Sequence, residues 1–392
     1  MFAYVDNAAT TPVGKAALES MTECLQQVYG NPSSIHSQGQ EAAQLMGKAR
    51  ETVGNCLGAR PEEIYFTSGG TEADNWAIKT AALLGARKNK KHLISTAFEH
   101  HAVLHSLRLW EKQGYSLTLL NVHGDGLVRP EELASAIRED TALVSVMYAN
   151  NEIGTVQPVA EIGTICRERG VLFHTDAVQA VGHLPIDAQE QKIDLLSLSA
   201  HKFHGPKGVG ALYCRKGIPL DIFMEGGAQE RGKRAGTENI PGIAGMAAAL
   251  KEACANMTED NKKVSALRDK LIQAMTRIPR SRLNGHPTRR LPGIANFCFS
   301  GIEGEGLLLH LDQHGICASS GSACTSGSLD PSHVLLAIGL PHEEAHGSLR
   351  ISLSALNTEA EVEHIIAMLP GLIEKLRSMS PVWQKIRQNE GS

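Results

Sequence analysis

Short apolar runs alternate with helix-like segments between about residue 60 and residue 215. The strands we expect are Ile64–Thr67, His92–Phe98, Ser116–Val122, Ala142–Tyr148, Val171–Thr175, Leu195–Ser199 and Val209–Cys214. The helices expected between them are Glu72–Gly85, His101–Gln113, Pro130–Arg138 and Val159–Arg169. Strands that alternate with helices of this length predict an α/β fold, with a mainly parallel sheet of seven strands covered by helices on both faces.

The pattern changes after about residue 240. Two long helices are expected there, Ile243–Asn256 and Lys262–Arg277, followed by a mixed segment and a closing helix, Glu359–Arg377. The last residues, Gln384–Ser392, are polar, and we expect them to fray. This second block predicts a smaller α+β domain, with the domain boundary near residue 255.

Length and charge narrow the class of function. The chain has 392 residues, and single cores stop growing near ~250–300 residues, so a large domain plus a smaller one is expected. Its 42 acidic and 38 basic side chains give a net charge of −4, which offers no overall positive charge to attract nucleic acid or an anionic membrane. No apolar stretch approaches the ~20 residues that cross a bilayer, and Asp6 stands where a signal peptide would be apolar. We therefore expect a cytoplasmic enzyme that acts on small molecules.

The eight cysteines form no CxxC pair and no cluster at zinc spacing, so neither a disulfide framework nor an intrinsic metal site is indicated. We expect most of them to be small buried side chains. Cys324 differs, because the stretch 318–328 around it is polar and rich in glycine. That stretch predicts a mobile loop with an exposed thiol kept for its reactivity. The alternative is a flexible linker with an incidental cysteine.

Polar residues follow the ends of the expected strands, where parallel α/β sheets bind their ligands. Ser68–Glu72 offers two glycines and hydroxyls at the start of a helix, which suits a phosphate. The other strand ends deliver a glutamate and a histidine, an Asn-Asn-Glu sequence, an aspartate with a glutamine, and a histidine with a lysine: Glu99, His100, Asn150, Asn151, Glu152, Asp176, Gln179, His201 and Lys202. Each of these alone is more often a turn, a cap or a structural residue. Together they are the groups that pyridoxal phosphate requires.

Lys202 is the lysine that we expect to form a Schiff base with the aldehyde of that cofactor. It follows an apolar strand and has small and polar neighbours, Ser199, Ala200 and His201. Asp176 would keep the proton on the pyridine nitrogen. The alternative for Lys202 is an exposed loop lysine, which would be preferred if the other strand-end residues were absent.

Seven motifs resemble, in content and in order, those of the pyridoxal-phosphate-dependent cysteine desulfurases of the nitrogen-fixation (NifS) and iron–sulfur-cluster type. They are Asp6–Pro12, Gly30–Ser34, Thr67–Glu72, Asn150–Gly154, His174–Ala177, Ser199–Lys202 and Ser320–Ser326. The match extends over nearly the whole chain. Gly70 stands where many relatives have Ala, and Ala200 where some have Gly. Neither difference removes a functional group.

The resemblance implies a role for each of several residues. Lys202, Cys324 and His100 are implied as catalytic, with His100 over the ring face of the cofactor. Asp176 would hold the pyridine nitrogen and Gln179 would contact the phenolic oxygen. The remaining implied contacts are Gly70, Thr71, Ser199 and His201 around the phosphate, Thr237 reaching the phosphate of the other subunit, Asn151 beside cofactor and substrate, and Asn31 with Arg350 on the substrate carboxylate.

The fold implied is fold type I of the pyridoxal-phosphate enzymes, as in class V aminotransferases. Residues 13–255 would form the large cofactor domain, and residues 1–12 and 256–392 the small domain. The activity implied is the removal of sulfur from L-cysteine, which gives L-alanine and a persulfide on Cys324. A homodimer is implied, as is an iron–sulfur scaffold protein that accepts the sulfur, in nitrogenase maturation or in housekeeping cluster assembly. The only metal contact considered is a transient iron–sulfur ligand role for Cys324 with that scaffold.

Three alternatives stay open. An aminotransferase of the same fold would need Lys202 and Asp176 but not Cys324. A selenocysteine lyase would share the cofactor, although the long Ser/Gly-rich segment resembles the desulfurases. A non-enzymatic iron–sulfur or metal-binding protein would use Cys324 with histidines, and the scattered cysteines argue against it.

Overall fold

The structure, a computed structural model, describes residues 1–320 and 331–390, with side chains described as far as residue 388. Its centre is a seven-stranded sheet in the order β2-β8-β7-β6-β5-β3-β4. The strands are β2 (Ile64–Thr67), β3 (His92–Thr96), β4 (Ser116–Leu120), β5 (Thr141–Ser145), β6 (Leu172–Asp176), β7 (Leu195–Ser199) and β8 (Gly210–Cys214). Only β8 runs antiparallel to its neighbours within this sheet. The mainly parallel seven-stranded α/β fold is therefore confirmed.

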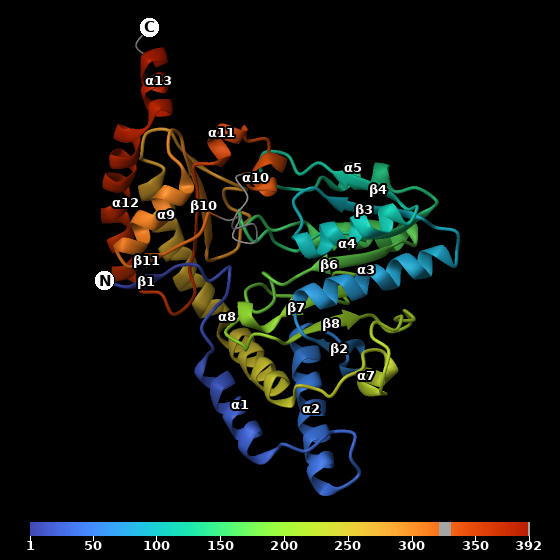
Figure 1. The fold of residues 1–392 in the computed structure, drawn as a ribbon. Coiled ribbons are helices and arrows are strands. Elements are labelled where there is room, and N and C mark those ends of the chain that lie inside the picture. The colour runs from blue at the N-terminus through green and yellow to red at the C-terminus, as the bar shows by residue number, and fades with distance from the viewer. Residues whose placement is uncertain (321–330, 391–392) are drawn as a thin grey trace.

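Helices cover both faces of this sheet (Figure 1). Successive side chains of a strand point to opposite faces, so Leu195 packs in one core with α3 (Gly70–Ala86) and α4 (His101–Lys112). Its neighbour Leu196 packs in the other core, to which α2 (Ser37–Cys56) and α6 (Val159–Arg169) contribute. Burial on both faces explains why these strands read as continuous apolar runs.

A second core lies toward the C-terminal part of the chain. Its strands are β9 (Ser281–Leu283), β10 (Ile294–Phe299) and β12 (Ser348–Ser352), in the order β12-β10-β9. The helices α9 (Gly304–Gln313) and α12 (Glu359–Met379) pack on it. The start of the chain joins this core, because β1 (Ala3–Tyr4) pairs in parallel with β11 (Ile316–Cys317), and Ala3 and Val5 are fully buried there.

The two long helices expected after residue 240 are one helix, α8 (Ile240–Met275). Its first part contributes Leu250 to the core of the large sheet, and its second part contributes Val264 to the second core. The polar stretch between them, residues 258–261, has no Gly or Pro to end a helix. A helix that bridges two cores needs no apolar face at its middle, so the apolar pattern breaks while the helix continues.

The C-terminal residues also differ from the expectation of fraying, because α13 (Pro381–Glu390) follows α12. Proline is favoured at the first position of a helix, and the Ser380 hydroxyl accepts a hydrogen bond from the Trp383 N–H (3.2 Å). The Arg377 guanidinium lies 4.0 Å from the centroid of the Trp383 ring. These contacts hold the start of α13 against α12.

The remaining helices are α1 (Lys15–Gln27), α5 (Pro130–Ala136), α7 (Gln229–Gly232), α10 (His333–Ala337) and α11 (His342–Ala345). Figure 1 shows α1 and α2 at the end of the molecule opposite α11 and α13. The lower part of α8 lies between α1 and α2. Among the helices of the described residues, none has the length and apolarity needed to span a membrane.

Candidate active site

The start of α3 has the geometry of an anion cradle. Gly69, the N-cap residue, has φ +154° and no side chain to accept from the first N–H groups of the helix. Those groups have no partner within a helix and carry partial positive charge. The backbone of β8 packs closely against Gly69, so position 210 must be glycine: a Cβ on Gly210 would meet the Gly69 Cα at 2.8 Å. A Cβ on Gly70 would lie 2.6 Å from a Val178 methyl and 3.6 Å from the Ser199 Cβ.

Asp176 ends β6 and is buried beside this cradle. Its Oδ1 accepts a hydrogen bond from the Val178 N–H at 2.9 Å. Burial raises the pKa of Asp176, whereas charge on His100 and Lys202 acts in the opposite direction. The charged form of this carboxyl is therefore favoured by a positive group placed against it.

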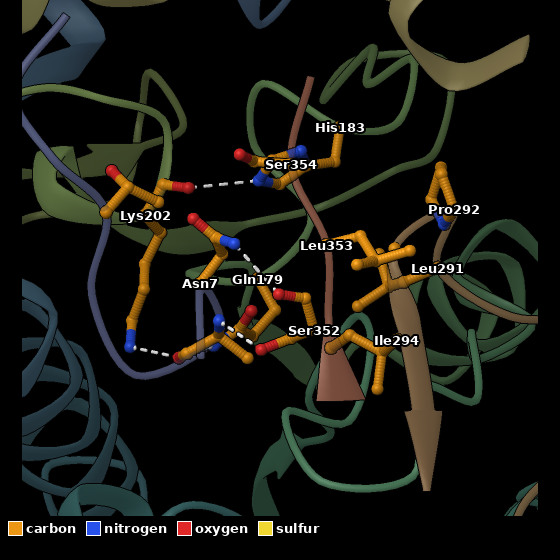
Figure 2. Close-up of a pocket in the computed structure, with 13 residues that line it drawn as sticks. Asn7, Gln179, His183, Lys202, Leu291, Pro292, Ile294, Ser352, Leu353 and Ser354 are labelled. Carbon is orange, nitrogen blue, oxygen red and sulfur yellow. Dashed lines mark hydrogen bonds between the residues drawn. The ribbon is translucent and has the colours of Figure 1, made fainter. Parts of the chain in front are cut away.

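Lys202 and Gln179 line the same pocket (Figure 2), and both donate to one backbone carbonyl from the start of the chain. The Lys202 Nζ donates to the Ala8 oxygen at 2.6 Å and to the Ala9 oxygen at 2.8 Å. The Gln179 Nε2 donates to the same Ala8 oxygen at 2.9 Å. Both side chains border a small pocket that also reaches Ser352, Leu353 and Leu291 of the C-terminal part. Lys202 is thus half-buried at a junction of the two cores rather than exposed on a loop.

One histidine lies near Asp176 and another next to Lys202. His100 caps α4, since its Nδ1 accepts from the Ala102 N–H at 3.1 Å. His201 precedes Lys202, and its Nδ1 lies 3.2 Å from the Thr10 hydroxyl. Burial and the neighbouring Lys202 and Lys207 lower the pKa of His201 to about 4. His201 is therefore a neutral imidazole at pH 7, able to donate one N–H.

Arg350 of β12 is buried and reaches toward the large sheet. Its Nη2 lies 2.7 Å from Oδ1 of Asp6, and its Nη1 donates to the Asn151 carbonyl at 3.1 Å. Its Nε is buried with no partner among the described atoms. A buried N–H of this kind costs free energy unless a further acceptor satisfies it, so the guanidinium has a donor to offer an incoming carboxylate.

Cys324 lies outside the described residues, but residues on both sides of the segment 321–330 are placed. Before it, Ser319 and Arg350 exchange backbone hydrogen bonds of 3.3 and 2.6 Å. After it, the His333 Nε2 lies 2.9 Å from the Glu99 carbonyl oxygen, and the Ser332 hydroxyl donates to buried Glu152. Both ends of the segment are therefore anchored to residues that adjoin Arg350 and His100.

Two predicted site residues are not brought into this group. Asn31 is exposed between α1 and α2, where its Oδ1 accepts from the Ser33 N–H at 2.9 Å. Thr237 is exposed between α7 and α8. Neither lines the pocket that borders Lys202. Thr71, in the first turn of α3, is exposed beside the buried Gly70.

Sequence reasoning missed the burial of three titratable side chains near Asp176. Asp74 of α3 lies 3.6 Å from the His174 Nε2, and Glu99 accepts from the Thr96 hydroxyl (2.7 Å) and the Met147 N–H (3.0 Å). Burial raises the pKa of Asp74 well above its usual range and that of Glu99 to about 8, and it lowers that of His174 to about 3. At pH 7 Glu99 is therefore mostly protonated and His174 is neutral, and burial disfavours the charged form of Asp74. The acidic residues were visible in the sequence, but their burial was not.

The fold and this site define an α/β enzyme in which a lysine, a buried aspartate and a helix N-terminus meet at strand ends. The family described as aminotransferase class-V matches residues 3–365, and the chain belongs to that family, whose members depend on pyridoxal phosphate.

Its relatives include proteins described as cysteine desulfurase IscS. That of Methanosarcina thermophila is 53% identical over 382 residues, which are 97% of this chain and 94% of the relative. That of Clostridium botulinum strain Hall is 52% identical over 390 residues, 99% and 98% of the two chains. Among solved structures, a NifS-like protein superposes with a TM-score of 0.90 at 40% identity, covering 96% of this chain and 100% of that one. The structure of DndA from Streptomyces lividans has a TM-score of 0.77 at 35% identity, with 88% and 98% covered.

The residues present fit the cofactor of this family. Gly69 and Gly70 open α3 with no side chain that caps its first N–H groups, which leaves those groups able to bind a phosphate. Burial leaves the Asp176 carboxyl in need of a positive partner, which a protonated pyridine nitrogen supplies. The amine of Lys202 stands on the same side of the sheet edge, hydrogen-bonded to carbonyls from which it can be released.

Proposed function

We propose that this protein is a cysteine desulfurase, which takes the sulfur of L-cysteine as a persulfide on Cys324 and releases L-alanine. The observation that carries the proposal is the anchoring of both ends of the Cys324 segment at the site, Ser319 on Arg350 and His333 on the Glu99 carbonyl. The relatives described as cysteine desulfurases, about half identical over nearly the whole chain, support the same activity.

The cofactor would be held by residues from several strand ends. Lys202 would bind its aldehyde, Asp176 its pyridine nitrogen and Gln179 its phenolic oxygen, with His100 over the ring. Its phosphate would be bound by the start of α3 and the end of β7, through Gly70, Thr71, Ser199 and the neutral imidazole of His201. When bound, pyridoxal phosphate withdraws electrons from the α-carbon of an amino acid and so weakens the bonds at that carbon.

The chain's own residues would position the substrate and move its protons. Arg350 would bind the α-carboxylate, for which its buried Nε–H is a donor, and Asp6 would fix the orientation of the guanidinium. Asn151, whose carbonyl already contacts Arg350, would lie beside the substrate. The Lys202 amine would take the α-proton and return it, with His100 as a second group for proton transfer.

The sulfur transfer itself would be performed by Cys324. Its thiolate would attack the substrate sulfur, so that a sulfur–sulfur bond forms as the carbon–sulfur bond breaks. The electron pair of the broken bond would stay with the carbon skeleton, which takes up a proton and leaves as L-alanine. The persulfide would then pass its outer sulfur to a thiol of an acceptor protein.

Two residues of the site would act across a dimer. Thr237 and Asn31 are exposed and lie outside the pocket that borders Lys202 of their own chain. Both are therefore accessible to a second copy of the chain. In this proposal, Thr237 completes the phosphate site of the partner, and Asn31 joins the partner's substrate site. The proposed domains are 13–255 and, for the smaller one, 1–12 with 256–392. The proposed sulfur acceptor is an iron–sulfur scaffold protein.

The experiment that tests this function is incubation of the purified holoenzyme with L-cysteine. Alanine and protein-bound sulfane sulfur should appear in equal amounts before a reductant is added, and sulfide should follow when dithiothreitol is present. An aminotransferase would instead give a keto acid and need an amino acceptor. A selenocysteine lyase would release alanine from selenocysteine and leave cysteine unchanged. Either result would contradict the proposal.

A further inference from the structure

The short helix α7 closes the outer edge of the large sheet. Within that sheet β2 is the last strand and pairs only with β8, so the backbone groups on its other edge have no strand as a partner. The Phe66 N–H on that edge donates to the Glu230 carboxylate at 3.1 Å. The Ile64 carbonyl on the same edge accepts from the guanidinium groups of Arg50 and Arg231. Side chains from α2 and α7 therefore satisfy the edge that a further strand would otherwise fill.

Glu230 is the centre of this arrangement. Its two carboxylate oxygens accept from the two terminal nitrogens of Arg50, at 2.9 and 2.7 Å. The Glu230 side chain is only 2% exposed and that of Arg50 is 13% exposed, so solvent does not screen the pair. The Arg50 guanidinium also lies 4.4 Å from the centroid of the Phe66 ring. A two-pronged buried pair fixes orientation more tightly than a single charge contact does.

The backbone at this point is held in an unusual conformation. Glu230 has φ 45° and ψ 45°, and the next residue, Arg231, has φ 59° and ψ 36°. Two successive left-handed residues that are not glycine persist only where their surroundings impose the conformation. Arg231 is held by stacking on the Tyr65 ring at 3.8 Å and by donating to the Glu62 carbonyl. The turn at 230–231 sets the direction in which the chain continues.

The continuing chain is fixed once more before it reaches Thr237. Arg234 donates to both oxygens of Glu72, at 2.8 and 3.1 Å. Glu72 in turn accepts from the Ser68 N–H at 3.0 Å, directly before the glycines of the phosphate cradle. The Ala235 N–H then donates to the Met224 carbonyl at 3.2 Å, and the Gly236 N–H donates to the Gln229 Oε1 at 3.2 Å. The exposed Thr237 directly follows the last of these contacts.

We infer that Glu230 is a positioning residue for the active site of the partner subunit, because its paired and strained turn aims Thr237 at the phosphate of the cofactor that a second copy of this chain holds. This inference rests on the proposed function, in which Thr237 completes that phosphate site. Arg50 acts through Glu230, and Arg234 links the turn to the cradle of its own subunit. Loss of the Glu230 carboxylate should thus weaken cofactor binding in the other subunit and leave its own site intact.

Hybrid dimers separate an effect of Glu230 on the partner's active site from an effect on the active site of its own chain. One chain carries Lys202→Ala and the other Thr237→Ala, so that a single site in the dimer has both Lys202, from the second chain, and Thr237, from the first. Glu230→Gln is added either to the chain that supplies Thr237 or to the chain that supplies Lys202. The dissociation constant of pyridoxal phosphate is measured from the absorbance of the lysine-bound cofactor. We expect it to rise about tenfold or more in the first hybrid and less than about twofold in the second.

The controls make each outcome decisive. Arg50→Lys keeps the charge and loses the two-pronged pair, so it should act in the same direction with a smaller effect, and it replaces Glu230→Gln if that chain does not assemble. Glu111→Gln, in the exposed pair with Arg108, should change neither hybrid. Equal weakening in both hybrids, or weakening only in the chain that supplies Lys202, would show a local structural role and overturn the inference. A parent hybrid that binds no tighter than the Thr237→Ala homodimer would overturn the shared site itself, and the inference with it.

Discussion

Arg350 and Asp6 lie 344 positions apart in the chain, yet their side chains form a partly buried ion pair of 2.7 Å at the centre of the candidate site. The pairing of β1 with β11 and the hydrogen bond from the Ser352 N–H to the Val5 carbonyl bring the two together. Among the described residues, the pair leaves the Arg350 Nε without an acceptor. Asp6 therefore fixes the guanidinium without using all of its donors.

Arg350→Lys should raise the KM for L-cysteine by at least about tenfold, because an ammonium group cannot reproduce the fixed, planar arrangement of donors of a guanidinium. Cofactor absorbance should stay unchanged, since no proposed cofactor contact is removed. Asp6→Asn should lower the free energy of unfolding by about 1–3 kcal/mol, since it leaves the buried guanidinium without its counter-charge. Steady-state kinetics and denaturant titrations measure the two effects. An unchanged KM in Arg350→Lys would place the substrate carboxylate elsewhere.

Local patterns were enough to predict the central sheet and the residues at its strand ends. Leu195–Ser199 and Val159–Arg169 were predicted to the residue, because an apolar run or an amphipathic period marks each of them. The α8 helix was split in two because its middle is polar, and only its position between two cores explains that polarity. No local pattern encodes the pairing of Asp6 with Arg350, since it depends on where β1 docks. The burial of Asp74 and Glu99 likewise follows from packing and not from their neighbours in sequence.

Lys202 should be the site of covalent cofactor attachment. Borohydride reduction of the holoenzyme followed by peptide mapping should place the adduct on Lys202, whose amine is held beside Gln179 at the Ala8 carbonyl. Lys202→Ala should abolish the adduct. Lys207 is exposed a few residues away and provides the matched control, because Lys207→Ala should leave the adduct in place. An adduct found on Lys207 in the wild-type protein would disprove the assignment.

Asp176→Asn should lower the turnover number by ~100-fold or more, because a neutral amide cannot hold a proton on the pyridine nitrogen. The folded protein should stay intact, since the amide oxygen can still accept from the Val178 N–H. Asp74→Asn is the matched control, because burial disfavours the charged form of Asp74 and the proposed mechanism uses no charge at that position. Near-normal alanine production by Asp176→Asn would show that another group serves the nitrogen.

Glu99 should make the protein less stable as the pH rises. Burial raises the pKa of Glu99 from 4.5 to about 8 in the folded state, so the folded protein keeps a proton that the unfolded chain has released. The stabilising contribution is therefore complete below pH 4.5 and is lost as the pH rises through 8. Glu99→Gln should flatten this dependence between pH 5 and 8 in urea titrations, and the exposed Glu111→Gln should not. Parallel curves for wild type and Glu99→Gln would mean that Glu99 is ionised in the folded protein.

Cys324→Ser tests the step that separates a desulfurase from other enzymes with the same cofactor. A serine hydroxyl is far too basic to act as the nucleophile at neutral pH, so persulfide and alanine should both fall below ~1% of the wild-type rate. Cofactor binding and the absorbance change on adding L-cysteine should remain, because Lys202, Asp176 and Arg350 are unchanged. Cys166→Ala, a fully buried position in α6, should keep both products and lower the free energy of unfolding by about 1 kcal/mol. If Cys324→Ser still formed alanine at the wild-type rate, sulfur would leave without a protein thiol, and a simple lyase would replace the persulfide mechanism.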